Sequence, residues 1–266
     1  MSEQERIVLV ACLWIAAITW GIWLFRGRRL SALMKPGPGR WALAATPPLC
    51  ALGLFAVLRW WSASDVRGDW AYLLFYQILG AAWVGLASVL LPWFGISPRD
   101  DVLERRNRAA AWALGGALLG VTACYAGANI GDGPGWWVVV YCAALATAAL
   151  FVLWFVLERI VHVSDSVTIE RDGGSALRLA GFLVGSGLIL GRAVAGDWTS
   201  IASTNADFLR LGWPAVALLG AACLFESALR PARDAALPSA LVHGLLPGAF
   251  HLAAAIGWLA WVGPWR

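Results

Sequence analysis

Two histidines in an apolar stretch near the end of the chain are the residues best suited to chemistry in a water-poor interior. His251 lies about 11 residues, or roughly 16 Å of helix, into the stretch 240–262, and His243 precedes it with Pro247 between them. Two histidines can ligate haem or relay protons, but haem needs suitably placed axial ligands, and the sequence offers no second histidine at that depth. We therefore expect a neutral His251 that is hydrogen-bonded to a neighbouring helix, and we expect no cofactor.

Four charged residues and two amides also lie in or beside apolar stretches. Glu226 and Arg230 are spaced for an i, i+4 ion pair at the end of one stretch. Arg192 and Asp197 lie at the start of the polar segment DWTSIASTNADF, which suits either a small-ligand or partner site or an ordinary solvated connection. Gln77 and Asn129 are expected to form interhelical hydrogen bonds.

The remaining reactive residue types predict little chemistry. Each cysteine stands alone in an apolar stretch, without the paired spacing of a metal site or a disulfide framework; these are Cys12, Cys50, Cys124, Cys142 and Cys223. The sequence shows no catalytic or nucleotide-binding motif, and no acid, base or metal cluster converges in it. We therefore expect neither a metal site nor an enzymatic activity.

The composition indicates the environment in which these residues work. Hydrophobic residues make up 60% of the 266 residues and the mean hydropathy is +0.70, more apolar surface than a water-soluble domain of this size can bury. Eight apolar segments each have the length needed to cross a bilayer as a helix. They cover residues 7–25, 41–61, 70–94, 109–128, 136–157, 176–195, 208–229 and 240–262. The sequence predicts an all-α polytopic membrane bundle that forms a single domain over 1–266.

The basic residues predict the orientation, because lysine and arginine are retained on the cytoplasmic side. The connections after the first, third, fifth and seventh spans hold 14 of them, and the other side holds 6. Both termini should therefore face the periplasm of a bacterial inner membrane. The net charge of +4 follows from this arrangement and gives no sign of nucleic-acid binding.

A two-span repeat is visible in the middle of the chain. ERRNRAAAWALGGALLG begins at Glu104, and ERDGGSALRLAGFLVGSG begins 66 residues later at Glu170. The clearest units are about 70–135 and 136–200. A repeat of two spans preserves orientation, so the copies should be parallel.

Glycine pairs spaced four residues apart recur in the spans that follow these polar runs. They are Gly116 with Gly120, Gly181 with Gly185, and Gly244 with Gly248. Small residues at this spacing let helix backbones approach closely in lipid. We expect the fourth, sixth and eighth spans to form the inner bundle through these glycines; the alternative is that their backbone lines a narrow pathway.

The polar runs and the glycine-rich helices resemble the YjfL-like family of bacterial inner-membrane proteins, domain of unknown function 350. Its two-span units begin with a polar run, Glu-Arg-Asp-Asn in the fullest form. The resemblance covers about 70–196 and places Glu104, Arg105 and Asn107 in the run of one copy and Glu170, Arg171 and Asp172 in that of the other. Arg106 and Gly173 depart from the pattern.

The resemblance implies no reaction, but it implies a partner, because such genes are often found beside soluble modifying enzymes such as ATP-grasp ligases. We expect an accessory membrane component that docks a cytoplasmic modifying enzyme through the turns at 99–108 and 158–175. Membrane lipids and further copies of the chain are the other expected partners. The alternative hypothesis is a channel or transporter with a pathway between the repeats.

Overall fold

The computed structural model describes residues 1–30, 37–230 and 239–263. Within these ranges the chain is helical, and eight segments are long and apolar enough to cross a membrane, which confirms the predicted all-α polytopic bundle. The membrane-crossing helices are α1 (Glu3–Leu30), α2 (Gly39–Trp60), α4 (Trp70–Leu90), α5 (Arg108–Gly127), α6 (Trp136–Val161), α8 (Gly173–Ala193), α9 (Ile201–Gly212) with α10 (Pro214–Leu229), and η3 (Leu241–Leu245) with α11 (Leu246–Val262). Shorter elements are α3 (Ser64–Gly68), η1 (Leu91–Phe94), η2 (Pro98–Glu104) and α7 (Val163–Thr168).

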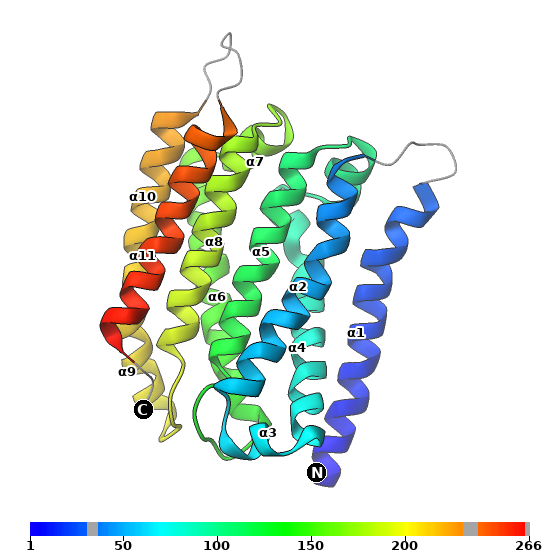
Figure 1. The fold of residues 1–266 in the computed structure, drawn as a ribbon, viewed down its shortest axis with the longest axis vertical. Coiled ribbons are helices and arrows are strands. Elements are labelled where there is room, and N and C mark those ends of the chain that lie inside the picture. Colours follow the sequence, from blue (N-terminus) through cyan, green and yellow to red (C-terminus); the bar gives the residue numbers. More distant parts are fainter. Residues whose placement is uncertain (31–36, 231–238, 264–266) are drawn as a thin grey trace.

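Some of the basic residues used to predict the orientation cannot be placed. Lys35, Arg233 and Arg266 lie outside the described residues, as do the side chains of 26–30. The described helices nevertheless have two distinct ends. Both termini lie at one end, here called the terminal end, whereas η2 and α7 lie at the opposite end, here called the turn end (Figure 1).

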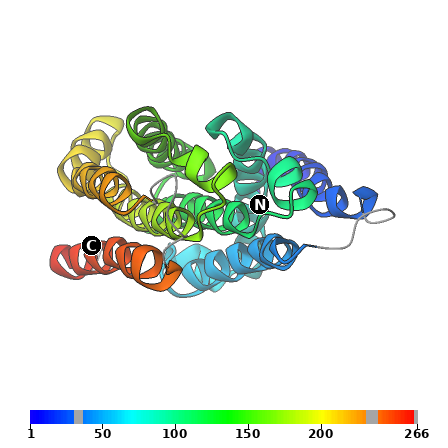
Figure 2. The ribbon, with the colours of Figure 1, turned by 90° about the horizontal axis from the view of Figure 1, so that it is seen from above.

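Helices α5 and α8 lie side by side at the centre of the bundle. Of the most apolar 18 residues in each of these spans, 78% and 72% are buried. Seen along the bundle, α2 and α11 lie on one side of the central pair, and α4 and α6 lie on the other (Figure 2). The expectation that the eighth span belongs to the inner bundle was wrong, because 17% of its most apolar 18 residues are buried and it contacts mainly α8.

Glycine allows the central helices to touch backbone against backbone. A Cβ atom added at Gly120 would lie 2.5 Å from the carbonyl oxygen of Leu183, and one added at Gly116 would meet the backbone of Ala180. The other glycines of the predicted pairs face α11 or α8: Gly181 meets Gly248, Gly185 meets the backbone of His251, Gly244 meets Gly174, and Gly248 meets Leu177. Such contacts leave no room for a side chain at these positions.

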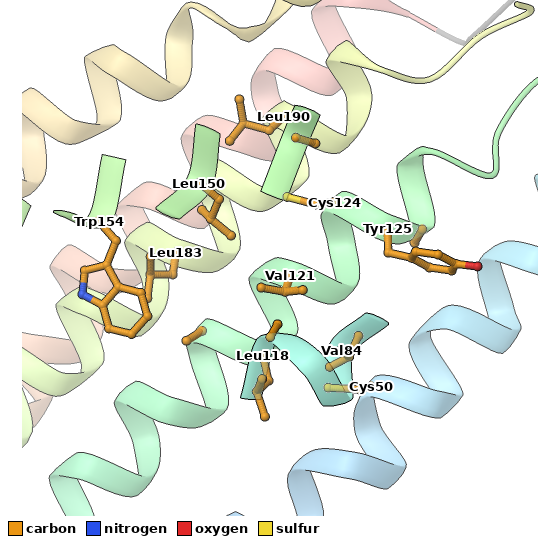
Figure 3. Close-up of a cluster of buried hydrophobic side chains, with 14 of the residues drawn as sticks. Cys50, Val84, Leu118, Val121, Cys124, Tyr125, Leu150, Trp154, Leu183 and Leu190 are labelled. Carbon is orange, nitrogen blue, oxygen red and sulfur yellow. The ribbon is translucent and has the colours of Figure 1, made fainter. Parts of the chain in front are cut away.

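Large apolar side chains fill the space around this contact. Leu118 and Val121 of α5, Leu150 and Trp154 of α6, and Leu183 of α8 are buried in one cluster (Figure 3). Tyr125 is also fully buried, and its hydroxyl donates to the carbonyl oxygen of Tyr76 at 2.9 Å. Packing and the glycine contacts together hold α4, α5, α6 and α8 in fixed register.

The seventh span differs from its prediction. It begins at Ile201 and consists of two helices that meet at Trp213 and Pro214. Proline at the first position of α10 has no N–H to donate to the preceding turn, so the helix is interrupted there. The first seven residues of α9 had been assigned to a polar connection because of their serine, threonine and asparagine content.

Candidate functional site

Two polar turns of the same geometry lie at the turn end of the bundle. After η2, the N–H groups of Arg105 and Asn107 donate to the carbonyl oxygens of Asp100 and Asp101 at 2.9 and 3.0 Å. After α7, Glu170 and Asp172 donate in the same way to Asp165 and Ser166, at 3.1 and 2.9 Å. Corresponding residues are 65 apart, so the predicted offset of 66 between Glu104 and Glu170 was wrong by one residue.

The residue before each helix cap has a left-handed backbone. Arg106 has φ of 58° and Arg171 has φ of 57°. Glycine usually occupies this position after a helix, and another residue there costs about 1–2 kcal/mol. Each of these two equivalent positions therefore has an arginine in a backbone conformation that is unfavourable for a residue with a side chain.

The helices that follow are capped by the next residue of each turn. The Oδ1 atom of Asn107 accepts from the N–H groups of Ala109 and Ala110, and the carboxylate of Asp172 accepts from Gly174 and Ser175. Glu104 and Glu170, which begin the two polar runs in the sequence, do not cap these helices. Both glutamates precede the left-handed arginine of their turn. Glu104 pairs with Arg99, and Glu170 pairs with Arg230.

Three arginines at this end are paired with carboxylates. Arg99 pairs with Glu104 at 2.9 Å, Arg105 pairs with Asp101 at 3.1 Å, and Arg230 pairs with Glu170 at 2.9 Å. The hydrogen bond from Arg230 to Glu170 raises the pKa of the Arg230 guanidinium. Arg105 had been predicted as an interaction residue, but much of its charge is compensated within its own turn.

A groove of about 300 Å³ lies between the two turns. Arg106, Arg108 and Arg171 line it together with Trp112 and Ala240, and all three arginine side chains are exposed. None of the three forms an ion pair with a described carboxylate. The guanidinium of Arg108 lies over the ring of Trp112, 5.0 Å from its centroid. We call this feature the arginine groove.

Beneath the arginine groove, a buried ion network joins three elements. Arg178 of α8 pairs with Glu226 of α10 at 2.8 Å and donates to the backbone carbonyl of His243 in η3. Ser175 contacts the carboxylates of both Glu226 and Asp172, at 2.6 and 2.9 Å. At most 3% of the surface of each of these charged side chains is exposed. Because charges this deeply buried need partners, the network fixes α10 and η3 against the start of α8.

This network overturns the predicted i, i+4 pair of Glu226 with Arg230. Glu226 faces α8, whereas Arg230 follows the last residue of α10, has extended backbone (ψ of 134°) and turns toward Glu170. Sequence analysis missed the roles of Arg178 and Ser175. The available signal was an arginine near the start of the apolar sixth span, Arg178, which we counted as a loop charge; the other arginine of that span is Arg192.

The second candidate region lies at the terminal end. Arg192, Asp197, Asp207 and Arg210 line a cavity of about 550 Å³ between α8, α9 and the end of α11. Within it, Asp207 pairs with Arg210 at 2.9 Å, and Asp197 accepts from the N–H group of Asp132 at 2.8 Å. The structure thus brings Arg192 and Asp197 to one cavity, where Asp197 also ties two connections together.

His251 is fully buried among polar backbone groups and aromatic rings. Its Nδ1 atom lies 2.9 Å from the carbonyl oxygen of Pro247 in the same helix, and its ring also faces the backbone of Leu218 in the neighbouring α10. The ring packs against Phe182, Phe225 and Phe250. The predicted interhelical bond of Gln77 does form, with Ala51 of α2, whereas Asn129 donates to Tyr125 of the preceding turn.

Comparison with known proteins identifies the part of the chain that contains both turns. Residues 61–172 match the model of a family described as Domain of Unknown Function (DUF350). No curated protein and no solved structure matches the chain. The matched region runs from the end of α2 through α4, α5 and α6 to the cap of α8, and it ends earlier than the motifs suggested. The resemblance to domain of unknown function 350 is thus confirmed over residues 61–172.

Proposed function

We propose that this protein is a membrane-embedded docking component whose turn end faces the cytoplasm and binds an acidic segment of a soluble partner. The arginine groove carries the proposal. Arg106, Arg108 and Arg171 converge there without described carboxylate partners, whereas Arg99, Arg105 and Arg230 at the same end are each paired. Three exposed arginines without an ion-pair partner among the described residues therefore lie together between the two turns.

Guanidinium groups suit this role because their planar donors form two parallel hydrogen bonds to a carboxylate or a phosphate. The left-handed backbone at Arg106 and Arg171 fixes where these two side chains leave the main chain. The buried network below holds the start of α8 in place. A docking surface of this kind should bind an acidic partner rapidly and should lose affinity as salt is raised.

The sequence supports both the proposed orientation of the protein in the membrane and the proposed kind of partner. The excess of basic residues in the connections at the turn end supports a cytoplasmic turn end, with both termini in the periplasm. The family resemblance supports a soluble modifying enzyme as the partner. We also take the two turn-containing units as copies of one two-span repeat and propose a homo-oligomer. In α1, 11% of the most apolar 18 residues are buried, so this helix is available for such contacts.

The central interface argues against transport between the repeats. Gly120 and Gly187 meet the backbone of the opposite helix in the α5–α8 contact, and Gly127 and Gly191 do the same nearer the terminal end. Backbone contact at successive turns leaves no space for a solute between these two helices. The docking function is therefore favoured over a pathway between α5 and α8.

Co-purification tests the proposal. The tagged full-length protein is extracted in mild detergent as wild type, as the double variant Arg106→Glu/Arg171→Glu, and as Arg159→Glu. Arg159 is an exposed arginine near the same end that lies over Phe155, outside the groove. We expect a soluble acidic protein to co-purify with wild type and with R159E, and to be lost from the double variant.

Two results would contradict the docking function. One is retention of the same protein by the double variant with wild-type yield. The other is solute flux in liposomes that contain the purified protein alone, with selectivity altered by R106E/R171E, which would support the channel hypothesis.

A further inference from the structure

A second groove opens near the middle of the bilayer, away from the turn end. It has a volume of about 230 Å³ and lies among α1, α2, α4 and α5. Pro47 lies eight residues into α2, about 12 Å from the turn end, and Gln77 lies seven residues into α4, about 10 Å from the terminal end. Both depths place the groove in the hydrocarbon core of a ~30 Å bilayer.

Most polar groups on the walls of this groove have partners within the protein. The indole N–H of Trp20 donates to the carbonyl oxygen of Ala81 at 2.8 Å, and the hydroxyl of Thr122 donates to Leu118 at 2.7 Å. Pro47 of α2 deprives the carbonyl of Leu43 of its helical donor, and the indole of Trp23 replaces that donor at 3.1 Å. The carbonyl oxygen of Leu43 therefore has a hydrogen-bond donor even though it lacks the usual helical one.

Gln77 is the exception. Its amide nitrogen donates to the carbonyl oxygen of Ala51 at 3.0 Å, which fixes the orientation of the amide. The other amide atom, Oε1, is buried and has no hydrogen-bond donor among the described residues. An unsatisfied acceptor is costly in the hydrocarbon core, where no bulk water can reach it.

The chemistry of the groove limits what can supply the missing donor. A stable buried water needs two to four polar partners, and Oε1 of Gln77 is the one side-chain acceptor among the described lining residues that is left without a partner. The acyl chains of phospholipids carry no donor. A hydroxyl on an apolar ring meets both requirements, since the ring can pack against Trp20 and the small residues Gly80 and Ala81, which line the same groove. We propose that this groove binds a lipid-soluble phenol or quinol, whose hydroxyl donates to Oε1 of Gln77.

The test compares two probes that differ in the donor. Binding of 1-naphthol and of its methyl ether is measured by equilibrium dialysis on the full-length protein in nanodiscs, with protein-free nanodiscs subtracted. We expect wild type to bind the naphthol at least about fivefold more tightly than the ether, as one net hydrogen bond allows. Gln77→Met should abolish the preference, whereas Thr46→Val should keep it, because Thr46 does not line the groove and its hydroxyl is bonded to the carbonyl oxygen of Ala42.

A variant that fills the groove keeps the test decisive even if Q77M fails to fold. Ala51→Phe places a ring at the wall of the groove and should weaken binding of both probes and remove the preference. Equal affinity of wild type for the two probes would overturn the proposal. So would a preference for the naphthol that persists in Q77M or in A51F.

Discussion

Arg106 and Arg171 occupy the same left-handed backbone position in two turns 65 residues apart, and both line one groove. Glycine fits that conformation better than arginine does. Replacing Arg171 by glycine should therefore raise the free energy of unfolding by about 1 kcal/mol while it weakens binding of the partner. Thermal unfolding and co-purification measure the two effects on one variant. Loss of stability in R171G would show that the side chain supports the fold rather than a partner.

The α5–α8 interface should be intolerant of even one added carbon. Gly120→Ala places a Cβ against the backbone of Leu183, so we expect a loss of about 1–3 kcal/mol through overpacking. Gly220→Ala is the matched control, because nothing lies within 4 Å of its added Cβ, and it should be neutral or slightly stabilising. Chemical unfolding in detergent compares the two variants. Equal stability would mean that α5 and α8 are not in backbone contact.

The buried network should respond to removal of a single partner. Arg178→Met leaves the carboxylates of Glu226 and Asp172 buried without their cation, which should cost about 3–5 kcal/mol. Adding Glu226→Met should recover part of that loss, because one uncompensated charge is removed with it. A double-mutant cycle measures this coupling. Strictly additive effects would contradict direct pairing of Arg178 with Glu226.

Topology gives a further prediction. Reporter fusions after Arg105 and after Arg230 should indicate the cytoplasm, and a fusion at the C-terminus should indicate the periplasm, because basic residues are concentrated in the connections at the turn end. A cytoplasmic C-terminus would place the arginine groove on the wrong side for a soluble cytoplasmic partner.

Hydropathy and length were sufficient to predict the eight spans, because each span must be apolar over the thickness of the bilayer. The same signal could not show which spans are central. The eighth span has glycines like those of α5 and α8, yet it lies at the periphery, because Gly244 and Gly248 both face α8 and Gly257 has no neighbour within 4 Å. Burial depends on how many sides of a helix have neighbours, and a local pattern does not contain that information.

The candidate site was only partly predictable, for a similar reason. The polar runs predicted the positions of both turns. They did not show that Asn107 and Asp172, rather than Glu104 and Glu170, cap the helices that follow. The partner of Glu226 lies 48 positions earlier in the chain, at Arg178, whereas the i, i+4 rule suggested Arg230. Local spacing describes contacts within one helix, and this network joins three elements.

The most direct test of the docking function places a photo-crosslinking amino acid in the arginine groove in living cells. At Trp112 the probe lies beside Arg108 in the groove, whereas at Trp93 it is highly exposed but outside the groove. We expect a crosslink to a soluble cytoplasmic protein from position 112, absent from position 93 and lost when R106E and R171E are added. Crosslinks to lipid alone from position 112, or to the same protein from both positions, would contradict docking through the arginine groove.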